Sequence, residues 1–190
     1  MTLYCATTNA DKLREFALAA GRGFEIAAIF PGAPPEETGV TFEENAALKA
    51  AYYSQRAEGW LFAEDSGLEV TALDGAPGIH SARFSPEGSD ASNNALLLSR
   101  LSGITDRRAR YVCAIAVARA GEVKTTFRGT VEGEILLEPR GTGGFGYDPL
   151  FYYPPFEAGF GEVAAERKFE VSHRRRALDA MFAWLATAAE

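Results

Sequence analysis

The chain has 190 residues, of which 47% are hydrophobic, and this suits one compact domain or one domain with two lobes. Its formal net charge of −7 argues against the overall positive field with which proteins hold a nucleic-acid polymer. Near the N-terminus there is no basic segment followed by a long apolar one, and no apolar run is long enough to span a bilayer, so we expect neither a signal peptide nor a membrane span.

Up to residue 73 the sequence predicts strands that alternate with helices. The polar run from Thr7 to Asn9 separates a short apolar segment from apolar residues at helical spacing, which is typical of a strand, a turn and a helix. Thr41 followed by Glu44 has the spacing of a capping box, and it predicts the start of another helix. The expected elements are strands over 3–6, 24–30, 60–63 and 68–73 and helices over 13–20 and 41–57.

The rest of the chain predicts a central strand and a terminal helix. Residues 111–118 are apolar on both faces, as expected of a strand that is covered on both sides. The last helix has Ser172 as its natural N-cap and a buried stripe of Leu178, Met181, Phe182 and Leu185. We also expect a helix over 92–101, a strand over 123–130 and a glycine-rich loop over 138–149. This order predicts a mixed α/β sheet with helices on its faces, in a single domain over residues 1–190.

Two cysteines, Cys5 and Cys113, lie far apart in the sequence. Each falls in an apolar run, which indicates buried free thiols rather than a disulfide or a zinc site. A reducing, cytoplasmic setting follows from this interpretation.

Polar residues that follow the predicted strands are the first candidates for a functional site. At the turn before the first helix, the backbone N–H groups, the hydroxyls and Lys12 suit a phosphate, although an ordinary N-cap with a solvent-facing lysine explains this turn as well. Glu64 and Asp65 come directly after a buried strand, where carboxylates suit Mg²⁺, and a plain acidic turn is the alternative. Taken alone, Glu36 and Glu37 are solvated loop residues.

The glycine-rich loop and a basic segment are the other candidates. Phe145 and Tyr147 offer flat faces for a base and Asp148 an acceptor for ring N–H groups, although aromatic residues of a hairpin loop can equally belong to the core. Around His173 five cations gather within residues 167–176 of an acidic chain. Arginines at the start of a helix are unfavourable unless an anion binds there, although a solvated basic face explains part of this cluster.

Taken together and in order, five segments resemble the inosine triphosphate pyrophosphatase family. They are TTNADKLREF, EETGVTFEENAALKA, AEDSGLEVTALDGAPGIHSARFS, EPRGTGGFGYDPLF and ERKFEVSHRRRAL, and they extend over nearly the whole chain. The resemblance implies an α/β fold with a mixed central sheet flanked by helices and two lobes with the active-site cleft between them. It implies hydrolysis of ITP, dITP and XTP to the monophosphate and pyrophosphate, one or more Mg²⁺ ions per subunit, and a cytoplasmic homodimer.

The same resemblance implies roles for the matching residues. Asp65 is expected to bind the metal and act as general base, with Glu36 or Glu37 as a second ligand, and Lys12 is expected to be catalytic. The segment that holds the triphosphate comprises Thr7, Thr8, Asn9, Ala10, Asp11 and Lys12. Further substrate contacts are expected from Ser66, Phe145, Gly146, Tyr147, Asp148, Lys168, His173 and Arg174. Of these, His173 and Arg174 would donate to a 6-oxo oxygen of the base, and Lys168 would help Lys12 to stabilise the pyrophosphate.

Four residues depart from the usual family pattern and leave the preference among ITP, dITP and XTP open. They are Thr8 for a glycine, Glu64 for an aspartate, His80 for a tyrosine and Phe169 for a polar residue. Three other functions remain compatible with the sequence: a pyrophosphatase for modified pyrimidine triphosphates, a nucleotide-binding regulator without turnover, and a structural α/β domain.

Overall fold

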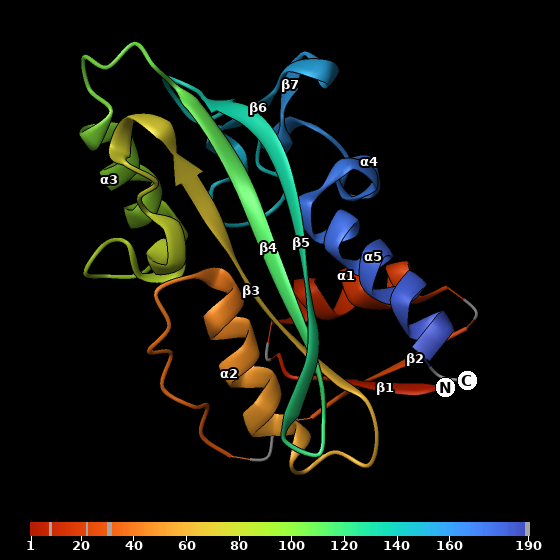
Figure 1. Cartoon of the computed structure of the whole chain (residues 1–190). Coiled ribbons are helices and arrows are strands. Elements are labelled where there is room, and N and C mark those ends of the chain that lie inside the picture. Colours follow the sequence, from red (N-terminus) through yellow and green to blue (C-terminus); the bar gives the residue numbers. More distant parts are fainter. Residues whose placement is uncertain (8, 22, 30–31, 189–190) are drawn as a thin grey trace. The chain divides into compact units, whose positions relative to one another are not determined.

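Figure 1 shows a computed structural model of the chain, which describes residues 1–7, 9–21, 23–29 and 32–188. Within these residues a seven-stranded mixed sheet has the strand order β2-β1-β3-β4-β5-β6-β7 and is flanked by helices. The strands are β1 (Thr2–Cys5), β2 (Glu25–Ala28), β3 (Leu61–Val70), β4 (Arg108–Arg119), β5 (Glu122–Ile135), β6 (Phe151–Tyr153) and β7 (Ala158–Gly159). The helices are α1 (Ala10–Ala20), α2 (Phe42–Ser54), α3 (Asp90–Arg100), α4 (Ala165–Val171) and α5 (His173–Ala188). Of the helices in the described part, none is both long and apolar enough to cross a bilayer.

The chain forms two compact units. The first unit comprises Met1–Asp65, Cys113–Gly129 and His173–Glu190, and the second comprises Ser66–Val112 and Thr130–Ser172. The strands β3, β4 and β5 each contribute residues to both units. The chain therefore passes between the units four times, and two of these passages fall at Asp65–Ser66 and Ser172–His173.

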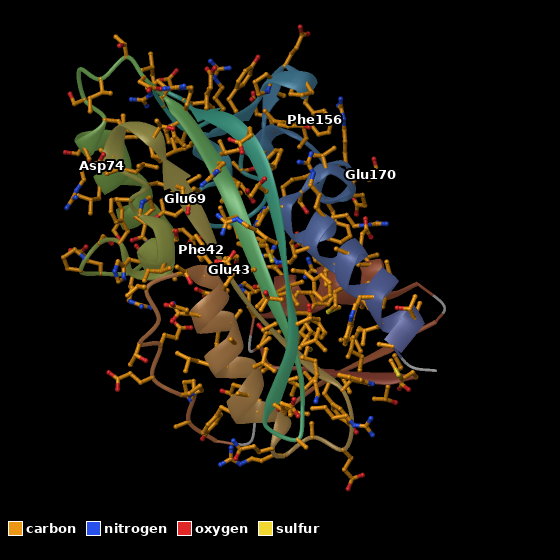
Figure 2. All side chains as sticks on the ribbon, in the orientation of Figure 1. Phe42, Glu43, Glu69, Asp74, Phe156 and Glu170 are labelled. Atoms are coloured by element: carbon orange, nitrogen blue, oxygen red, sulfur yellow. The ribbon has the colours of Figure 1, made fainter. Side chains whose placement is uncertain are left out.

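In the first unit, helices pack on parallel strands. The strand β1 pairs in parallel with β2 and β3, and the rings of Phe16 and Phe62 meet edge to face with their centroids 4.9 Å apart. The helix α5 packs on α1 and buries the expected Leu178, Met181 and Leu185. At the start of α2, Glu43, labelled in Figure 2, accepts a hydrogen bond from Arg128 at 2.6 Å.

The second unit has a core of aliphatic and aromatic side chains. The strands β5, β6 and β7 pair antiparallel. The Phe151 ring lies 4.6 Å from Tyr111 and 5.0 Å from Phe160, centroid to centroid. Between β3 and β4, Glu69, labelled in Figure 2, accepts a hydrogen bond from Arg110 at 2.6 Å.

The structure confirms helix starts and a central strand that the sequence predicts. The hydroxyl of Thr41 accepts a hydrogen bond from the N–H of Glu44 at 3.1 Å, so that Thr41 is the N-cap of α2. The Glu44 carboxylate in turn accepts the N–H of Val40 at 2.6 Å. In β4, residues 111–118 are all buried, as their apolar pattern predicts.

The prediction of two short strands around the acidic pair is wrong. A single strand, β3, runs from Leu61 to Val70, so Glu64 and Asp65 lie inside a strand and not at a strand end or in a turn. The strand accommodates Glu64 because cationic side chains pair with it. At Gly67 a Cβ atom would lie 2.4 Å from Oγ of Ser81, so this glycine lets Ser81 pack closely against the strand and does not mark a turn. The helix α4 was not expected, and Ser172 alone separates it from α5.

Candidate active site

In the first unit, the predicted phosphate segment forms the start of α1. The side-chain oxygen of Asn9 accepts the N–H groups of Asp11 at 2.9 Å and Lys12 at 3.1 Å, so the helix is capped by its own sequence. Thr7 in turn accepts the N–H of Asn9 at 3.2 Å. Thr8, expected in the same segment, lies outside the described residues. Asn9 thus satisfies two of the N–H groups at the start of α1.

A buried ion network connects this turn with β3 and α5. Nζ of Lys12 lies 2.5 Å from Oε1 of Glu64, and Nε of Arg174 lies 3.0 Å from Oε2 of the same carboxylate. Arg174 also pairs with Glu15 of α1, and Cys113 donates its S–H to Glu64 at 3.1 Å. The side chains of Glu64 and Arg174 are only 2% exposed. Arg174 and Cys113 fix the carboxylate of Glu64, and this carboxylate therefore holds Lys12 in place.

The charges of this network stabilise one another. Burial opposes the ionisation of Glu64, but Arg174 and Lys12 outweigh it and hold the pKa of Glu64 well below its usual value. Burial likewise opposes the charge of Arg174, while Glu64 and Glu15 raise the pKa of its guanidinium. Burial and the Glu64 charge raise the pKa of Cys5 to about 12 and that of Cys113 well above its usual value. Both cysteines are therefore protonated thiols at neutral pH, as their apolar surroundings in the sequence indicated.

Asp65 is the centre of a second group in the first unit. Nζ of Lys49, on α2, lies 3.0 Å from Oδ1 of Asp65 and 2.7 Å from Oε1 of Glu37. Asn45 donates its side-chain amide to Oδ2 of Asp65 at 3.3 Å and accepts the N–H of Gly39 at 2.9 Å. Asn45 thus connects the loop before α2 to Asp65. Two carboxylates and one ammonium converge, with side chains that are 13–26% exposed.

Burial sets the protonation behaviour of this group. It raises the pKa of Asp65 above its usual value, since it outweighs the opposing effect of Lys49. For Lys49, burial favours the neutral form, but Asp65 and Glu37 outweigh it and raise the pKa. An aspartate with a raised pKa is a better proton acceptor than one in water.

The donor set around Asp65 suits a divalent cation with a preference for oxygen. Of the two glutamates left open by the sequence, Glu37 reaches the group, whereas Glu36 is exposed. Among the described residues, no three acidic, histidine or cysteine side chains gather as a metal site. Mg²⁺ is commonly held by one or two carboxylates together with water and substrate phosphates, so two carboxylates are a fitting set.

In the second unit, Asp148 organises the glycine-rich loop. Its Oδ2 accepts the N–H of Phe145 at 2.8 Å and the ammonium of Lys168 at 2.7 Å, and its Oδ1 accepts the hydroxyl of Tyr111 at 3.3 Å. At Gly144, where φ is +74°, a Cβ atom would lie 2.1 Å from Oδ2 of Asp148. Only glycine permits this approach, so the loop sequence and the position of Asp148 depend on each other.

The two aromatic residues of the loop have different surroundings. Tyr147 is 4% exposed, belongs to the core of the second unit and donates its hydroxyl to the carbonyl of Ser81 at 2.8 Å. Phe145 is half-buried, and the ammonium of Lys168 lies 4.7 Å from its ring centroid. The sequence left open whether these aromatic residues face a base or belong to the core. Tyr147 belongs to the core and anchors the loop, whereas Phe145 retains an accessible side.

The other predicted substrate residues lie near the passages between the units. Ser66 is half-buried on β3, directly after Asp65, and His173 is the first residue of α5. At Gly129 a Cβ atom would lie 2.1 Å from the carbonyl oxygen of His173, so β5 passes closely under the first turn of α5. Nε and Nη1 of Arg174 are bound to the two carboxylates of the ion network.

Sequence reasoning missed Glu15, Asn45 and Lys49. A signal for two of them was present, because Asn45 and Lys49 share the spacing of Phe42, Ala46, Ala50 and Tyr53, which form the buried face of α2. A polar residue on such a face indicates a specific partner. Glu15 does not lie within a comparable apolar pattern of α1, and its partner Arg174 lies 159 residues further along the chain, so the sequence offers no signal for it.

Comparison with known proteins shows which family the chain resembles over its length. Residues 3–184 match the model of the Ham1 family. The dITP/XTP pyrophosphatase of Acidobacterium capsulatum is 49% identical over an alignment of 199 residues. The alignment includes 97% of this chain and 98% of that protein. The dITP/XTP pyrophosphatase of an Exiguobacterium species is 49% identical over 183 residues, covering 94% and 93%. The solved structure of the Ham1 protein of Staphylococcus aureus has a TM-score of 0.89 at 39% identity and covers 99% of this chain and 100% of that one.

The fold and the two groups of residues define an α/β protein with a lysine–carboxylate centre in one unit and an aromatic, glycine-rich loop in the other. The chain belongs to the Ham1 family, since both the family model and the relatives match it over nearly its whole length. This result confirms the family resemblance and the α/β fold class that the sequence indicated.

Proposed function

We propose that this chain is a nucleoside triphosphate pyrophosphatase that hydrolyses dITP, XTP and ITP to the monophosphate and pyrophosphate and thereby clears them from the nucleotide pool. Relatives of nearly the same length are named dITP/XTP pyrophosphatases. The observation that carries the proposal is the partly buried carboxylate of Asp65, which lies beside Lys49 and Glu37 and has a raised pKa.

The phosphate chain is assigned to the residues of the first unit. The Lys12 side chain is 23% exposed while that of Glu64 is 2% exposed, so Lys12 is the partner that can turn toward a phosphate. When it does, Glu64 stays paired with Arg174 and no buried carboxylate is left without a cation. Thr7, Asn9, Ala10 and Asp11 complete the segment proposed to hold the triphosphate.

Hydrolysis of the bond between the α- and β-phosphates requires an activated water. Asp65 and Glu37 are the residues that would hold Mg²⁺, and bound Mg²⁺ would draw charge from the phosphate oxygens and lower the pKa of a coordinated water. Asp65 accepts the proton of the attacking water, for which its raised pKa suits it better than an ordinary aspartate. Lys12 and Lys49 stabilise the negative charge of the departing pyrophosphate. Lys168, expected in this role from the family resemblance, is buried and paired with Asp148 at 2.7 Å.

Base recognition is assigned to the aromatic loop and the start of α5. Phe145 offers its ring to the purine. Lys168 and Asp148 fix the loop around that ring. Gly146 and Tyr147 determine the path of the loop backbone. His173 is the proposed donor to a 6-oxo oxygen. Arg174, expected from the family resemblance to donate to the same oxygen, has its Nε and Nη1 bound to Glu64 and Glu15. Adenine has an amino group at this position and would leave a buried donor unsatisfied, at a cost of about 1–3 kcal/mol.

Two of the predicted substrate residues directly follow a passage of the chain from one unit to the other, since Ser66 follows Asp65 and His173 follows Ser172. Ser66 is proposed as the substrate contact next to the catalytic aspartate.

The proposal is tested with a panel of triphosphates in the presence of Mg²⁺. We expect dITP, XTP and ITP to be hydrolysed to monophosphate and pyrophosphate with a kcat/KM about 10- to 100-fold above that for ATP, as one unsatisfied donor of the stated cost implies. We expect the three substrates to be preferred to GTP as well. Chromatographic analysis of both products distinguishes this reaction from the release of single phosphates. Equal turnover of ATP, or a preference for modified pyrimidine triphosphates included in the panel, would contradict the proposed substrate class.

The assignment of Glu37 as a metal ligand leads to a specific expectation. Glu37→Gln should raise the Mg²⁺ concentration needed for half-maximal rate by about 10-fold or more, since one of two carboxylate ligands loses its charge. Glu36→Gln is the matched control, because Glu36 carries the same group in an exposed position next to it. A Mg²⁺ titration of both variants with ITP checks this, and a larger shift for Glu36→Gln would reverse the assignment.

We further propose that the enzyme is a homodimer that acts in the cytoplasm. The free, buried thiols of Cys5 and Cys113 suit a reducing compartment. Light scattering coupled to size-exclusion chromatography measures the mass directly, and a mass near 20.5 kDa for the active species would exclude the dimer.

A further inference from the structure

The first residues of α3 contact the middle of the aromatic loop. Oδ2 of Asp90 accepts the N–H of Gly146 at 2.7 Å, and the side-chain amide of Asn94 donates to the carbonyl oxygen of Gly146 at 3.0 Å. Asp90 and Asn94 are four residues apart and therefore lie on the same side of the helix. Both polar groups of Gly146 are thus held from one helix, although more than fifty residues separate it from α3.

Helix capping does not account for Asp90. The N-cap of α3 is Ser89, whose hydroxyl accepts the N–H of Ser92 at 3.2 Å, and the Ser92 hydroxyl accepts the N–H of Ser89 at 3.2 Å. This reciprocal pair caps the helix without Asp90. The Asp90 carboxylate instead binds a peptide group of another segment, in a hydrogen bond that its negative charge strengthens.

The contact fixes the loop at the residue after Phe145. Gly146 has a φ of +62°, a left-handed conformation that glycine adopts readily. The hydrogen bonds with Asp90 and Asn94 hold the peptide in this conformation. On the other side of Phe145, its own N–H is bound to Asp148 at 2.8 Å. The backbone of Phe145 is therefore held at both ends, and its ring lies 4.7 Å from the ammonium of Lys168.

We propose that Asp90 and Asn94 are positioning residues for base recognition, because they hold the Gly146 peptide and thereby the ring of Phe145. The inference rests on the proposed function, since it assigns α3 to the part of the site that receives the oxopurine. A ring that is fixed before the nucleotide binds loses little conformational freedom on binding, so the contact favours substrate affinity and selectivity rather than the chemical step.

The test compares Asp90→Ala, Asn94→Ala and the conservative Asp90→Asn with the full-length wild-type enzyme, using ITP and ATP. We expect Asp90→Ala and Asn94→Ala each to raise KM for ITP by about 10-fold at a kcat within about 2-fold of wild type, and to reduce the ITP/ATP ratio of kcat/KM. Asp90→Asn keeps an acceptor oxygen and should recover most of the loss. Glu87→Ala, which removes an exposed acidic group three residues before Asp90, is the control for charge.

Thermal unfolding of each variant separates positioning from stability. If KM and the ITP/ATP ratio stay at wild-type values in both alanine variants, or if kcat and the unfolding temperature fall while the ratio stays constant, the positioning role is wrong and the proposed function stands. If the wild-type enzyme shows no preference for ITP over ATP, the proposed function fails, and this inference fails with it.

Discussion

Asp65→Asn should lower kcat for ITP by about 10³-fold while the protein stays folded, because the amide cannot accept the proton of the attacking water. The substitution is nearly isosteric, and Lys49 retains Glu37 as its partner at 2.7 Å. Asn45 can still donate to the remaining side-chain oxygen. The loss should therefore appear in kcat and in the response to Mg²⁺, and far less in the unfolding temperature.

Steady-state kinetics at saturating Mg²⁺, with thermal unfolding of the same samples, tests this expectation. Lys49→Met serves for comparison, because it removes the cation from the same group but leaves the carboxylate of Asp65. We expect a smaller loss of kcat for Lys49→Met and a shift of the acidic limb of its pH–rate profile to higher pH, since Lys49 counteracts the effect of burial on the pKa of Asp65. An Asp65→Asn enzyme with more than about a tenth of wild-type kcat would rule out Asp65 as the general base.

Arg174→Met should destabilise the protein by about 3–5 kcal/mol, because it leaves the carboxylates of Glu64 and Glu15 buried without their shared cation. For a chain of this length each kcal/mol corresponds to about 2–4 °C, so the unfolding temperature should fall by about 10 °C. Methionine fills much of the space of the arginine stem, and most of the loss should therefore come from charge.

Arg175→Met is the matched control, because Arg175 pairs with Asp179 at 2.7 Å on the exposed side of the same helix. Such surface pairs contribute about 0.3–0.5 kcal/mol, so this variant should unfold within about 2 °C of wild type. Equal destabilisation by the two substitutions would show that the Glu64 network is not a special contributor to stability.

The pH dependence provides a second check on Arg174→Met. In the wild type, the lowered pKa of Glu64 contributes stability that is present above its unfolded-state pKa and is lost as the pH falls through the lower folded-state value. Without Arg174, only Lys12 and Cys113 oppose the effect of burial, so the pKa of Glu64 rises toward its unfolded-state value and less of this stability remains. The difference in unfolding temperature between the two proteins should therefore narrow as the pH falls below about 4.5.

Features of the fold that depend on neighbouring residues could be predicted from the sequence. Thr41 begins α2 because its hydroxyl and Glu44 lie within one helical turn, and residues 111–118 form a central strand because they are apolar on both faces. The family motifs likewise placed Asp65 and Phe145 in a functional context. The inferences about α2 and the central strand hold because the physical cause lies within a few residues of the effect.

The rest could not be predicted, because it depends on partners far away in the chain. The continuity of β3 through Glu64 requires Arg174, which is 110 residues distant, and no local pattern shows that this carboxylate is buried and paired. The course of the aromatic loop depends in the same way on Lys168 and Asp90. From the residues next to them in the sequence, these polar residues would be assigned to turns or to solvent. In the folded chain they belong to hydrogen-bond and ion-pair networks whose other members are distant in the sequence.

The four passages of the chain between the two units limit how this protein can be divided genetically. Neither unit is encoded by one continuous stretch, and β3, β4 and β5 each belong to both. A truncated gene would therefore express a fragment in which one or both units lack part of their chain, and a cut in an exposed loop would not release an autonomous piece. Variants for dissecting this enzyme must be point substitutions in the full chain.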